Sequence, residues 1–351
     1  MKKWEENIRK VEPYVPGEQP QKKVIKLNTN ENPYPPAPGV AKVLNSMDTD
    51  ELRKYPDPTS ESLVCELAKF YGVKKEQVFV GVGSDDVLAM SFLTFFNSGK
   101  PILFPDLTYS FYKVWAELFR IPYECPKLDK DFRIQRQDYY KKNGGIIFPN
   151  PNAPTGIYEN LDFVEDILKH NEDVIVIVDE AYIDFAGPSA VLLLEKYDNL
   201  LVVQTFSKAR SMAGMRIGYA IGNKRLIRYL NDVKYSFNSY TMSRAALLAG
   251  VESVRDRSYF EKTTEEIIKT REWAKEEFLR LGFSFPDSRA NFLFVTHPDH
   301  EAKEIFEKLK ECDVYVRYFG GERTGRYLRV SIGTKEEMEK LFDALGRILT
   351  R

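Results

Sequence analysis

Histidine and cysteine are scarce in this chain of 351 residues, which holds three of each. The cysteines lie far apart and form no CxxC pair, so we expect reduced thiols and no disulfide framework. His297 and His300 lie close together in "THPDHEAK", but neither a cysteine nor a third histidine is near them in the sequence. The scarcity argues against a zinc site and against a catalytic triad built on histidine.

Long apolar runs and blocks of like charge are also missing. No apolar run approaches the roughly 18 residues of a membrane span, and the charged start "MKKWEENIRK" lacks the apolar core of a signal peptide. Lysine and arginine number 51 against 52 acidic residues, so no basic excess is present that would attract nucleic acid. We therefore expect a cytoplasmic protein that binds small molecules or another copy of itself, with neither nucleic acid nor membrane as partner.

The sequence does contain short apolar runs that alternate with longer amphipathic ones. The runs "QVFVGVG", "GGIIFPN", "DVIVIVDE" and "LLVVQTF" are typical of strands buried on both faces of a parallel sheet. The pattern predicts an α/β fold with a mostly parallel, doubly wound sheet, followed by a smaller α+β domain. We expect an N-terminal arm over residues 1–40 that joins the small domain or a dimer interface, a large cofactor-binding domain over 41–235, and a small domain over 236–351.

Glycines and an asparagine follow two of these runs, at one edge of the predicted parallel sheet. "QVFV" is followed by Gly83, Ser84 and Asp85 and then by a helix, whose first free N–H groups suit a phosphate. "GGIIF" is followed by the turn "PNPNAPTG", which contains Asn152. By itself, the glycine segment is explained equally well as a turn with no further duty, and for the asparagine segment such a turn is the more frequent case.

Charged residues and a phenol follow the next two runs. Asp179 and Tyr182 come after "VIVIV", where a buried carboxylate needs a cationic partner. "LLVVQTF" is followed by Ser207, Lys208, Arg210 and Arg216. A lone carboxylate there fits a salt bridge or a helix cap, and a lone lysine is usually solvated. The combination at one sheet edge is harder to explain in this way.

The combined set matches what pyridoxal phosphate requires, namely a lysine, an acidic partner for the ring nitrogen and a phosphate site. Lys208 can condense with the cofactor's aldehyde and later act as the base for the substrate's α-proton. Asp179 would keep the pyridine nitrogen protonated. Tyr182 and an asparagine of the turn can hydrogen-bond the ring 3-hydroxyl, and Tyr109 in "LTYSFY" can stack on the ring.

The chain resembles the fold type I pyridoxal-phosphate aminotransferases, and among these the histidinol-phosphate aminotransferase family. The resemblance covers the whole length and is carried, in order, by "LNTNENPYPP", "YPDPTSESL", "GSDDVL", "LTYSFY", "NPNAPTG", "DEAYIDFAG", "TFSKARSMAGMRIGY", "ANFLFV", "VYVR" and "YLRVSIGT". It implies transfer of an amino group between histidinol phosphate and 2-oxoglutarate, with imidazole-acetol phosphate and glutamate as products, a step of histidine biosynthesis.

The resemblance also assigns roles to single residues. It implies catalytic roles for Lys208, Asp179 and Tyr182. Cofactor binding is implied for Gly83, Ser84, Asp85, Tyr109, Asn152, Ser207 and Arg216, with support from Arg210. In this family Tyr55 of "YPDP" reaches the cofactor phosphate of the neighbouring subunit, which implies a homodimer with shared active sites. Substrate binding is implied for Tyr14, Asn30, Arg317 and Arg329.

Two positions depart from the family pattern. Ala153 stands where the family commonly has the asparagine that contacts the cofactor, so Asn152 or Tyr182 alone is left for that contact. The segment that starts at Ser84 reads Ser-Asp-Asp where Ala-Asp-Glu is usual. Alternatives within the fold are an L-threonine-O-phosphate decarboxylase and an aromatic amino-acid aminotransferase, and a non-enzymatic anion-binding protein is an alternative of another class.

Lys208 provides the first test. The purified protein should absorb above 400 nm in a pH-dependent way, and Lys208→Ala should abolish turnover because the covalent anchor and the base are lost together. Borohydride reduction followed by peptide mass mapping should find the adduct on Lys208. A colourless protein whose activity survives the substitution would contradict the cofactor hypothesis.

Overall fold

A seven-stranded sheet in the order β2-β8-β7-β6-β5-β3-β4 forms the centre of the computed structural model, which describes residues 2–350. Every pair in it is parallel except those of β8, which runs antiparallel to both β2 and β7. The strands are β2 (Val78–Gly81), β3 (Ile102–Leu103), β4 (Tyr123–Glu124), β5 (Ile146–Pro149), β6 (Val176–Asp179), β7 (Leu200–Thr205) and β8 (Gly218–Gly222). The predicted mostly parallel sheet is confirmed.

Helices cover both faces of this sheet because its central strands are buried on each side. One face packs against α3 (Gly83–Phe95), α4 (Phe111–Phe119) and α6 (Lys224–Phe237). The other face packs against α1 (Pro38–Asn45), α2 (Glu61–Tyr71), α5 (Leu161–Lys169) and α7 (Arg244–Arg255). The sheet is therefore doubly wound, as expected.

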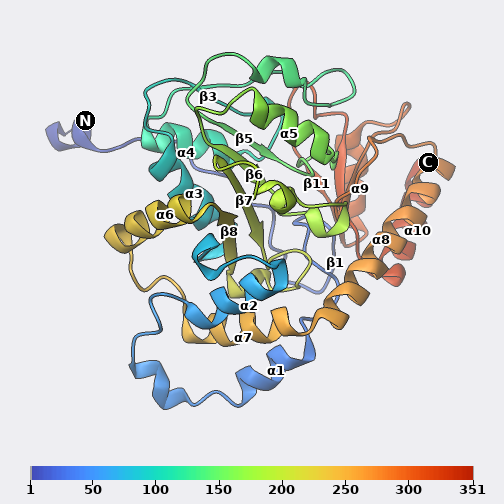
Figure 1. Cartoon of the computed structure of the whole chain (residues 1–351). Coiled ribbons are helices and arrows are strands. Elements are labelled where there is room, and N and C mark those ends of the chain that lie inside the picture. The colour runs from blue at the N-terminus through green and yellow to red at the C-terminus, as the bar shows by residue number, and fades with distance from the viewer. Residues whose placement is uncertain (1, 351) are drawn as a thin grey trace.

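A smaller antiparallel sheet, in the order β11-β12-β9, lies beside the large one (Figure 1). It consists of β9 (Phe292–Val295), β11 (Arg317–Tyr318) and β12 (Leu328–Ser331). Its helices are α8 (Arg257–Arg280), α9 (Ala302–Glu311) and α10 (Lys335–Leu349). The N-terminal segment joins this unit, because β1 (Ile25–Lys26) pairs in parallel with β10 (Val314–Tyr315).

Short 3₁₀ helices complete the secondary structure: η1 (Lys3–Asn7), η2 (Thr49–Arg53), η3 (Lys75–Gln77), η4 (Arg136–Tyr139), η5 (Ile183–Phe185), η6 (Ala190–Leu193) and η7 (Ala213–Met215). Between residues 2 and 350, no helix has the length and apolarity needed to cross a membrane. The buried residues of α7 belong to the cluster around the large sheet, although α7 lies beyond residue 235. The domain boundaries stay predictions, and the packing of α7 favours placing the second one later.

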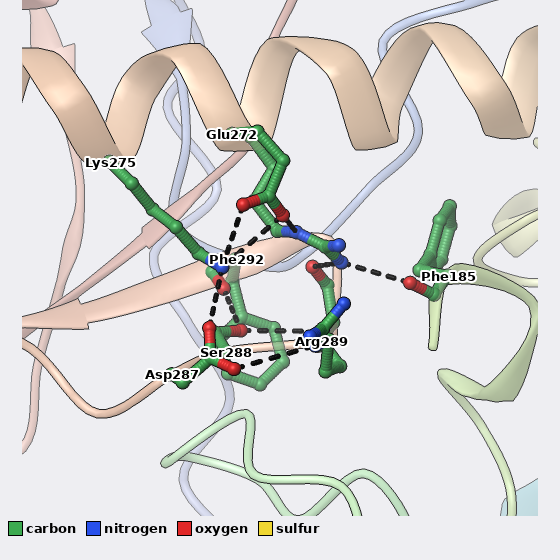
Figure 2. Close-up of polar contacts among 9 residues, drawn as sticks. Phe185, Glu272, Lys275, Asp287, Ser288, Arg289 and Phe292 are labelled. Atoms are coloured by element: carbon green, nitrogen blue, oxygen red, sulfur yellow. Dashed lines mark hydrogen bonds and ion pairs between the residues drawn. The ribbon is translucent and has the colours of Figure 1, made fainter. Parts of the chain in front are cut away.

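Helix α8 is anchored by Arg271, whose side chain is 1% exposed. Its Nη1 donates to the carbonyl oxygens of Phe185 at 2.9 Å and Ala290 at 3.1 Å. Phe185 belongs to the segment after β6, and Ala290 precedes β9, so one guanidinium joins the two units. Figure 2 shows the neighbouring contacts, in which Lys275 reaches both Glu272 and Asp287.

Arg271→Met should lower the free energy of unfolding by about 2–4 kcal/mol, because two buried carbonyl groups lose their donor. Denaturant unfolding of the purified protein measures this change. Arg280→Met on the same helix is the matched control, since its ion pair with Glu277 is exposed and contributes less than about 1 kcal/mol. Equal losses in the two variants would show that Arg271 does not join the units.

Candidate active site

A cavity of about 460 Å³ opens between the carboxyl-end edge of the large sheet, the small sheet and the N-terminal segment. Ligands of open α/β sheets bind at this edge. Seven of the residues predicted from sequence line the cavity: Tyr14, Asn30, Tyr109, Tyr182, Lys208, Arg317 and Arg329. The fold thus brings together residues that are as many as 315 positions apart in the chain, from Tyr14 to Arg329.

Lys208 is held at the cavity by the segment around "NTNEN". Its Nζ donates to the carbonyl oxygen of Thr29 at 3.0 Å and lies 5.7 Å from the centroid of the Tyr182 ring. The side chain of Asn32 donates to the backbone carbonyls of Lys208 and Ala209, at 3.0 and 3.1 Å. The amine is therefore positioned in the cavity without a carboxylate partner of its own among residues 2–350.

Asp179 ends β6 and is buried with 4% of its surface exposed. Its Oδ2 accepts from the Tyr112 hydroxyl at 2.7 Å, and its Oδ1 accepts from the Ala181 N–H at 3.3 Å. No lysine or arginine in the described part of the chain forms an ion pair with it, so burial raises its pKa to about 6. A carboxylate that lacks a protein cation in this position fits the protonated ring nitrogen of pyridoxal phosphate.

The glycine turn before α3 also fits its predicted role as an anion site. Gly83 has φ +83°, and a Cβ there would lie 2.5 Å from Nη2 of Arg216. The same guanidinium pairs with Asp85 at 3.1 Å, and Asp85 accepts from the Tyr109 hydroxyl at 2.7 Å. Because Gly83 has no side chain, Arg216 lies close to the start of α3. The free N–H groups of this helix can bind a phosphate there.

Ser207 follows β7 and directly precedes Lys208 in the chain. Its hydroxyl oxygen accepts from the Thr205 hydroxyl at 3.0 Å, and its own proton therefore stays free for another acceptor. Together with Gly83, Ser84, Asp85 and Arg216, it supplies the donors that a phosphate group needs. The residues present therefore fit pyridoxal phosphate at both its ring and its phosphate end.

Asn152 and Tyr55, both predicted to bind the cofactor, do not line the cavity and contact other parts of the chain. Asn152 is buried and donates to the carbonyl of Leu107 and to Thr155, whereas its neighbour Ala153 lines the cavity. Tyr55 is 78% exposed and stacks on Tyr240, with ring centroids 4.5 Å apart. Their predicted contacts with a cofactor stay predictions, and that of Asn152 requires it to release its present partners.

Arg210 has a different place from the one predicted. It is 5% exposed, donates to the carbonyl of Ser253 at 2.7 Å and packs over the rings of Phe70, Phe206 and Phe260. A guanidinium surrounded by three rings is engaged in cation–π contacts. Its observed contacts therefore attach α7 to the segment after β7 and include none with the phosphate cluster.

Two contributors to the site were missed at the sequence level. Tyr112 supplies the hydrogen bond to Asp179, and Asn32 holds the backbone of Lys208. Tyr112 comes three residues after Tyr109 in "LTYSFY"; it lies in the first turn of α4, whereas Tyr109 precedes that helix. Asn32 lies in the motif "LNTNENPYPP", but only the fold brings that motif to Lys208.

Known proteins resemble the chain over most of its length. Residues 22–345 match the family described as aminotransferase class I and II. The histidinol-phosphate aminotransferase of Clostridium botulinum (strain Okra / Type B1) is 51% identical over 351 residues, which cover 100% of this chain and 99% of the relative. That of Chromohalobacter salexigens is 49% identical over 98% of both chains.

Solved structures share the fold at lower identity. The histidinol-phosphate aminotransferase of Clostridium acetobutylicum matches with a TM-score of 0.85 at 24% identity, over 93% of this chain and 99% of that one. The Sinorhizobium meliloti enzyme, in complex with pyridoxal-5'-phosphate, matches with a TM-score of 0.84 at 22% identity, over 93% and 90%. The L-threonine-O-3-phosphate decarboxylase of Porphyromonas gingivalis matches at 0.79 and 18% identity, over 93% and 100%. The predicted fold class is confirmed.

Asp179→Asn should change how stability depends on pH. Because burial raises the pKa of Asp179 from 3.8 to about 6, the folded cofactor-free protein is more stable when this carboxyl is protonated. The contribution of the protonated carboxyl to the free energy of unfolding is complete below about pH 4 and is lost as the pH rises through 6. Asn keeps an acceptor for Tyr112, so the variant should gain up to about 3 kcal/mol over the wild type between pH 4 and 7.

Urea unfolding of both cofactor-free proteins across this pH range measures the difference. Glu180 and Asp184 also have raised pKa values, but both are present in the two proteins, so the difference isolates Asp179. The gain should shrink when the cofactor is bound, because a cationic ring nitrogen stabilises the wild-type carboxylate. A difference that does not vary with pH would contradict the unpaired buried carboxylate.

Proposed function

This chain belongs to the class I and II aminotransferase family, and we propose that it transfers the amino group of L-histidinol phosphate to 2-oxoglutarate. The products are imidazole-acetol phosphate and L-glutamate. Full-length relatives about half identical to the chain are named histidinol-phosphate aminotransferases, which supports this substrate. In the structure, the observation that carries the proposal is a pair of partly buried arginines, Arg317 and Arg329, that both line the cavity.

Pyridoxal phosphate is the cofactor of this family, and when bound it accepts the amino group and the electrons of the broken Cα–H bond. Lys208 would hold it through its amine, which, once free, would move the proton at the substrate's α-carbon. Asp179 would keep a proton on the ring nitrogen, and Tyr182 would donate to the ring 3-oxygen. Arg216 and Ser207, together with the N–H groups at the start of α3, bind the phosphate.

The arginine pair lies on neighbouring strands of the small sheet, where Arg317 of β11 is directly opposite Arg329 of β12. Arg329 is partly buried, its buried Nε has no hydrogen-bond partner in the described residues, and desolvation lowers its pKa. Like charges that face each other across strands are destabilising without a counter-ion. A phosphate or carboxylate group satisfies both guanidinium groups, so one site serves histidinol phosphate and glutamate in turn.

Acidic side chains line the same cavity and favour a substrate with a basic ring. Glu117 comes from α4 and Glu12 from the N-terminal segment. Lys113 lines the cavity too and pairs with Glu117 at 3.7 Å, so Glu12 carries the argument for an imidazole ring, which threonine phosphate lacks. This distribution supports histidinol phosphate over the decarboxylase alternative, although that fold is closely shared.

The assembly we propose is a homodimer in which each subunit completes the other's site. Tyr55 is a large phenol with 78% of its surface exposed and lies outside the cavity of its own chain. An interface with a second copy would give this exposed ring an apolar environment, and its hydroxyl would reach the second cofactor phosphate. We also propose a cytoplasmic location, which accords with three cysteines that form no disulfide in the described residues.

A substrate panel tests the reaction. Histidinol phosphate and 2-oxoglutarate should give glutamate at a rate well above that with phenylalanine or tyrosine as amino donor, and no CO₂ should form. Release of CO₂ from threonine phosphate without 2-oxoglutarate would identify the decarboxylase instead. Strong turnover of aromatic amino acids alone would identify an aromatic aminotransferase.

Arg329→Lys should raise KM for both histidinol phosphate and glutamate by about 10- to 100-fold, because a bidentate charge-assisted contact is worth about 1.5–3 kcal/mol. Steady-state kinetics with each substrate measures the change. Arg326→Lys is the control, since Arg326 is exposed and outside the cavity. An unchanged KM in the Arg329 variant would place the substrate anion elsewhere.

A further inference from the structure

We propose that Ser331 is a positioning residue that acts through Asn30 to aim the hydroxyl proton of Tyr182 into the cavity. No motif or resemblance assigned a role to Ser331. The inference rests on the role of Tyr182 in the proposed function and adds what orients its phenol. It is carried by a chain of hydrogen bonds whose direction the donors and acceptors determine.

Ser331 holds Asn30 at two points. The backbone N–H of Asn30 donates to Oγ of Ser331 at 2.9 Å, and the Ser331 hydroxyl donates to Oδ1 of Asn30 at 3.0 Å. A hydroxyl has one proton, and because Oγ already accepts from the N–H, that proton is free for Oδ1. With the amide reversed, Oγ would accept twice and its proton, on a serine that is 2% exposed, would lack this acceptor. The side-chain oxygen of Asn30 therefore faces Ser331, and its NH₂ group faces the other way.

The NH₂ group of Asn30 meets Tyr182. Its Nδ2 donates to the Tyr182 hydroxyl oxygen at 3.0 Å, and Asn30 is 1% exposed, so water does not compete for this contact. An amide NH₂ has no acceptor to offer, so Tyr182 accepts here and keeps its own proton for another partner. If the amide were reversed, Tyr182 would give its proton to Oδ1 and would have none left for a ligand.

The hydroxyl proton of Tyr182 has no acceptor in the described residues and can be donated to a group bound in the cavity. Tyr182 lines the cavity and forms no other side-chain hydrogen bond within residues 2–350. Its ring lies 5.7 Å from the Lys208 amine, so a group bound at that amine lies within reach of the phenol. Ser331 thus sets the donor direction of a residue that it does not touch.

The small unit and the N-terminal segment hold this chain of contacts together. Ser331 ends β12, and its backbone N–H donates to the carbonyl of Leu27 at 3.0 Å. Asn291, just before β9, donates to the carbonyl of Asn30 at 3.0 Å. Asn30 has φ +56°, a conformation that asparagine adopts more readily than most residues. Tyr182 belongs to the large unit, so its donor is aimed from across the boundary between the two.

The test is a pH titration of the absorbance band above 400 nm in the holoenzyme. This band reports a proton shared between the Lys208 nitrogen and the ring oxygen of the cofactor, and a donor on that oxygen weakens its hold on the proton. Ser331→Ala lets the Asn30 amide turn, so the midpoint should rise by about one pH unit, toward the value of Tyr182→Phe. Ser331→Thr keeps the hydroxyl and should restore the wild-type midpoint.

The double variant separates orientation from a structural effect. In the Tyr182→Phe background, Ser331→Ala should add no further shift, because the phenol through which it acts is gone. Asn30→Asp is a second route, since a carboxylate would accept the Tyr182 proton and the midpoint should rise as well. Ser91→Ala is the matched control, as Ser91 is a fully buried serine of α3 that donates to Val87 and should leave the midpoint unchanged.

Kinetics provide a second readout. Ser331→Ala should lower kcat of the glutamate half-reaction about 10-fold with little change in KM, since no substrate contact is removed. An unchanged midpoint in Ser331→Ala, or an undiminished shift in the double variant, would overturn the inference. The titration needs no amino substrate, so failure of the wild type to use histidinol phosphate would overturn the proposed function alone.

Discussion

The carboxylate of Asp179 lies in the interior, and no lysine or arginine within residues 2–350 forms an ion pair with it; the chemistry of the site depends on that constraint. Desolvation of an unpaired carboxylate is costly, and the hydrogen bonds from Tyr112 and the Ala181 N–H offset only part of the cost. A cationic ring nitrogen relieves it, so the folded chain is complementary to a ligand with a positive charge at that depth. The strand that delivers Asp179 is central in the sheet, which fixes the position of the carboxylate closely.

The N-terminal segment around Asn30 is the second determinant, because it contacts both units and the reactive lysine. Thr29 accepts from the Lys208 amine, Asn32 binds the Lys208 backbone, and Asn30 connects Tyr182 with Ser331. The groups of the segment that form these hydrogen bonds are backbone groups and side-chain amides, and they carry no net charge. The amine and the phenol are therefore both positioned by a stretch of chain that reaches the site from outside the large sheet.

Much of the site could be predicted because buried parallel strands end abruptly in polar residues. The pattern located Asp179, Tyr182 and Lys208; the last two line the cavity, and Asp179 is buried at the carboxyl end of β6. Contacts that depend on packing could not be predicted in this way. Arg210 follows Lys208 closely in the chain, yet three aromatic rings from separate segments hold it away from the phosphate cluster.

The same limit applies to amides and to domain edges. The sequence predicted Asn152 as a cofactor ligand. In the folded turn its side chain donates to Leu107 and Thr155 and accepts from Thr108, and these contacts cannot be read from the sequence. Helix α7 has the charged amphipathic texture of the small unit, whereas its apolar face packs against α1 and α2. Local periodicity identifies a helix and its buried face, but it does not identify the surface against which that face packs.

Strand β8 passes directly beneath the start of α3, and this crossing limits how the sequence can vary. A Cβ at Gly218 would lie 2.2 Å from the backbone of Gly83 and Ser84, closer than any atoms can pack. Any side chain at Gly218 would therefore displace the turn that presents N–H groups to the phosphate. Because the clash is with backbone atoms, no change of side chain at Gly83 or Ser84 relieves it, so the shape of the anion site depends on a glycine in the strand below it.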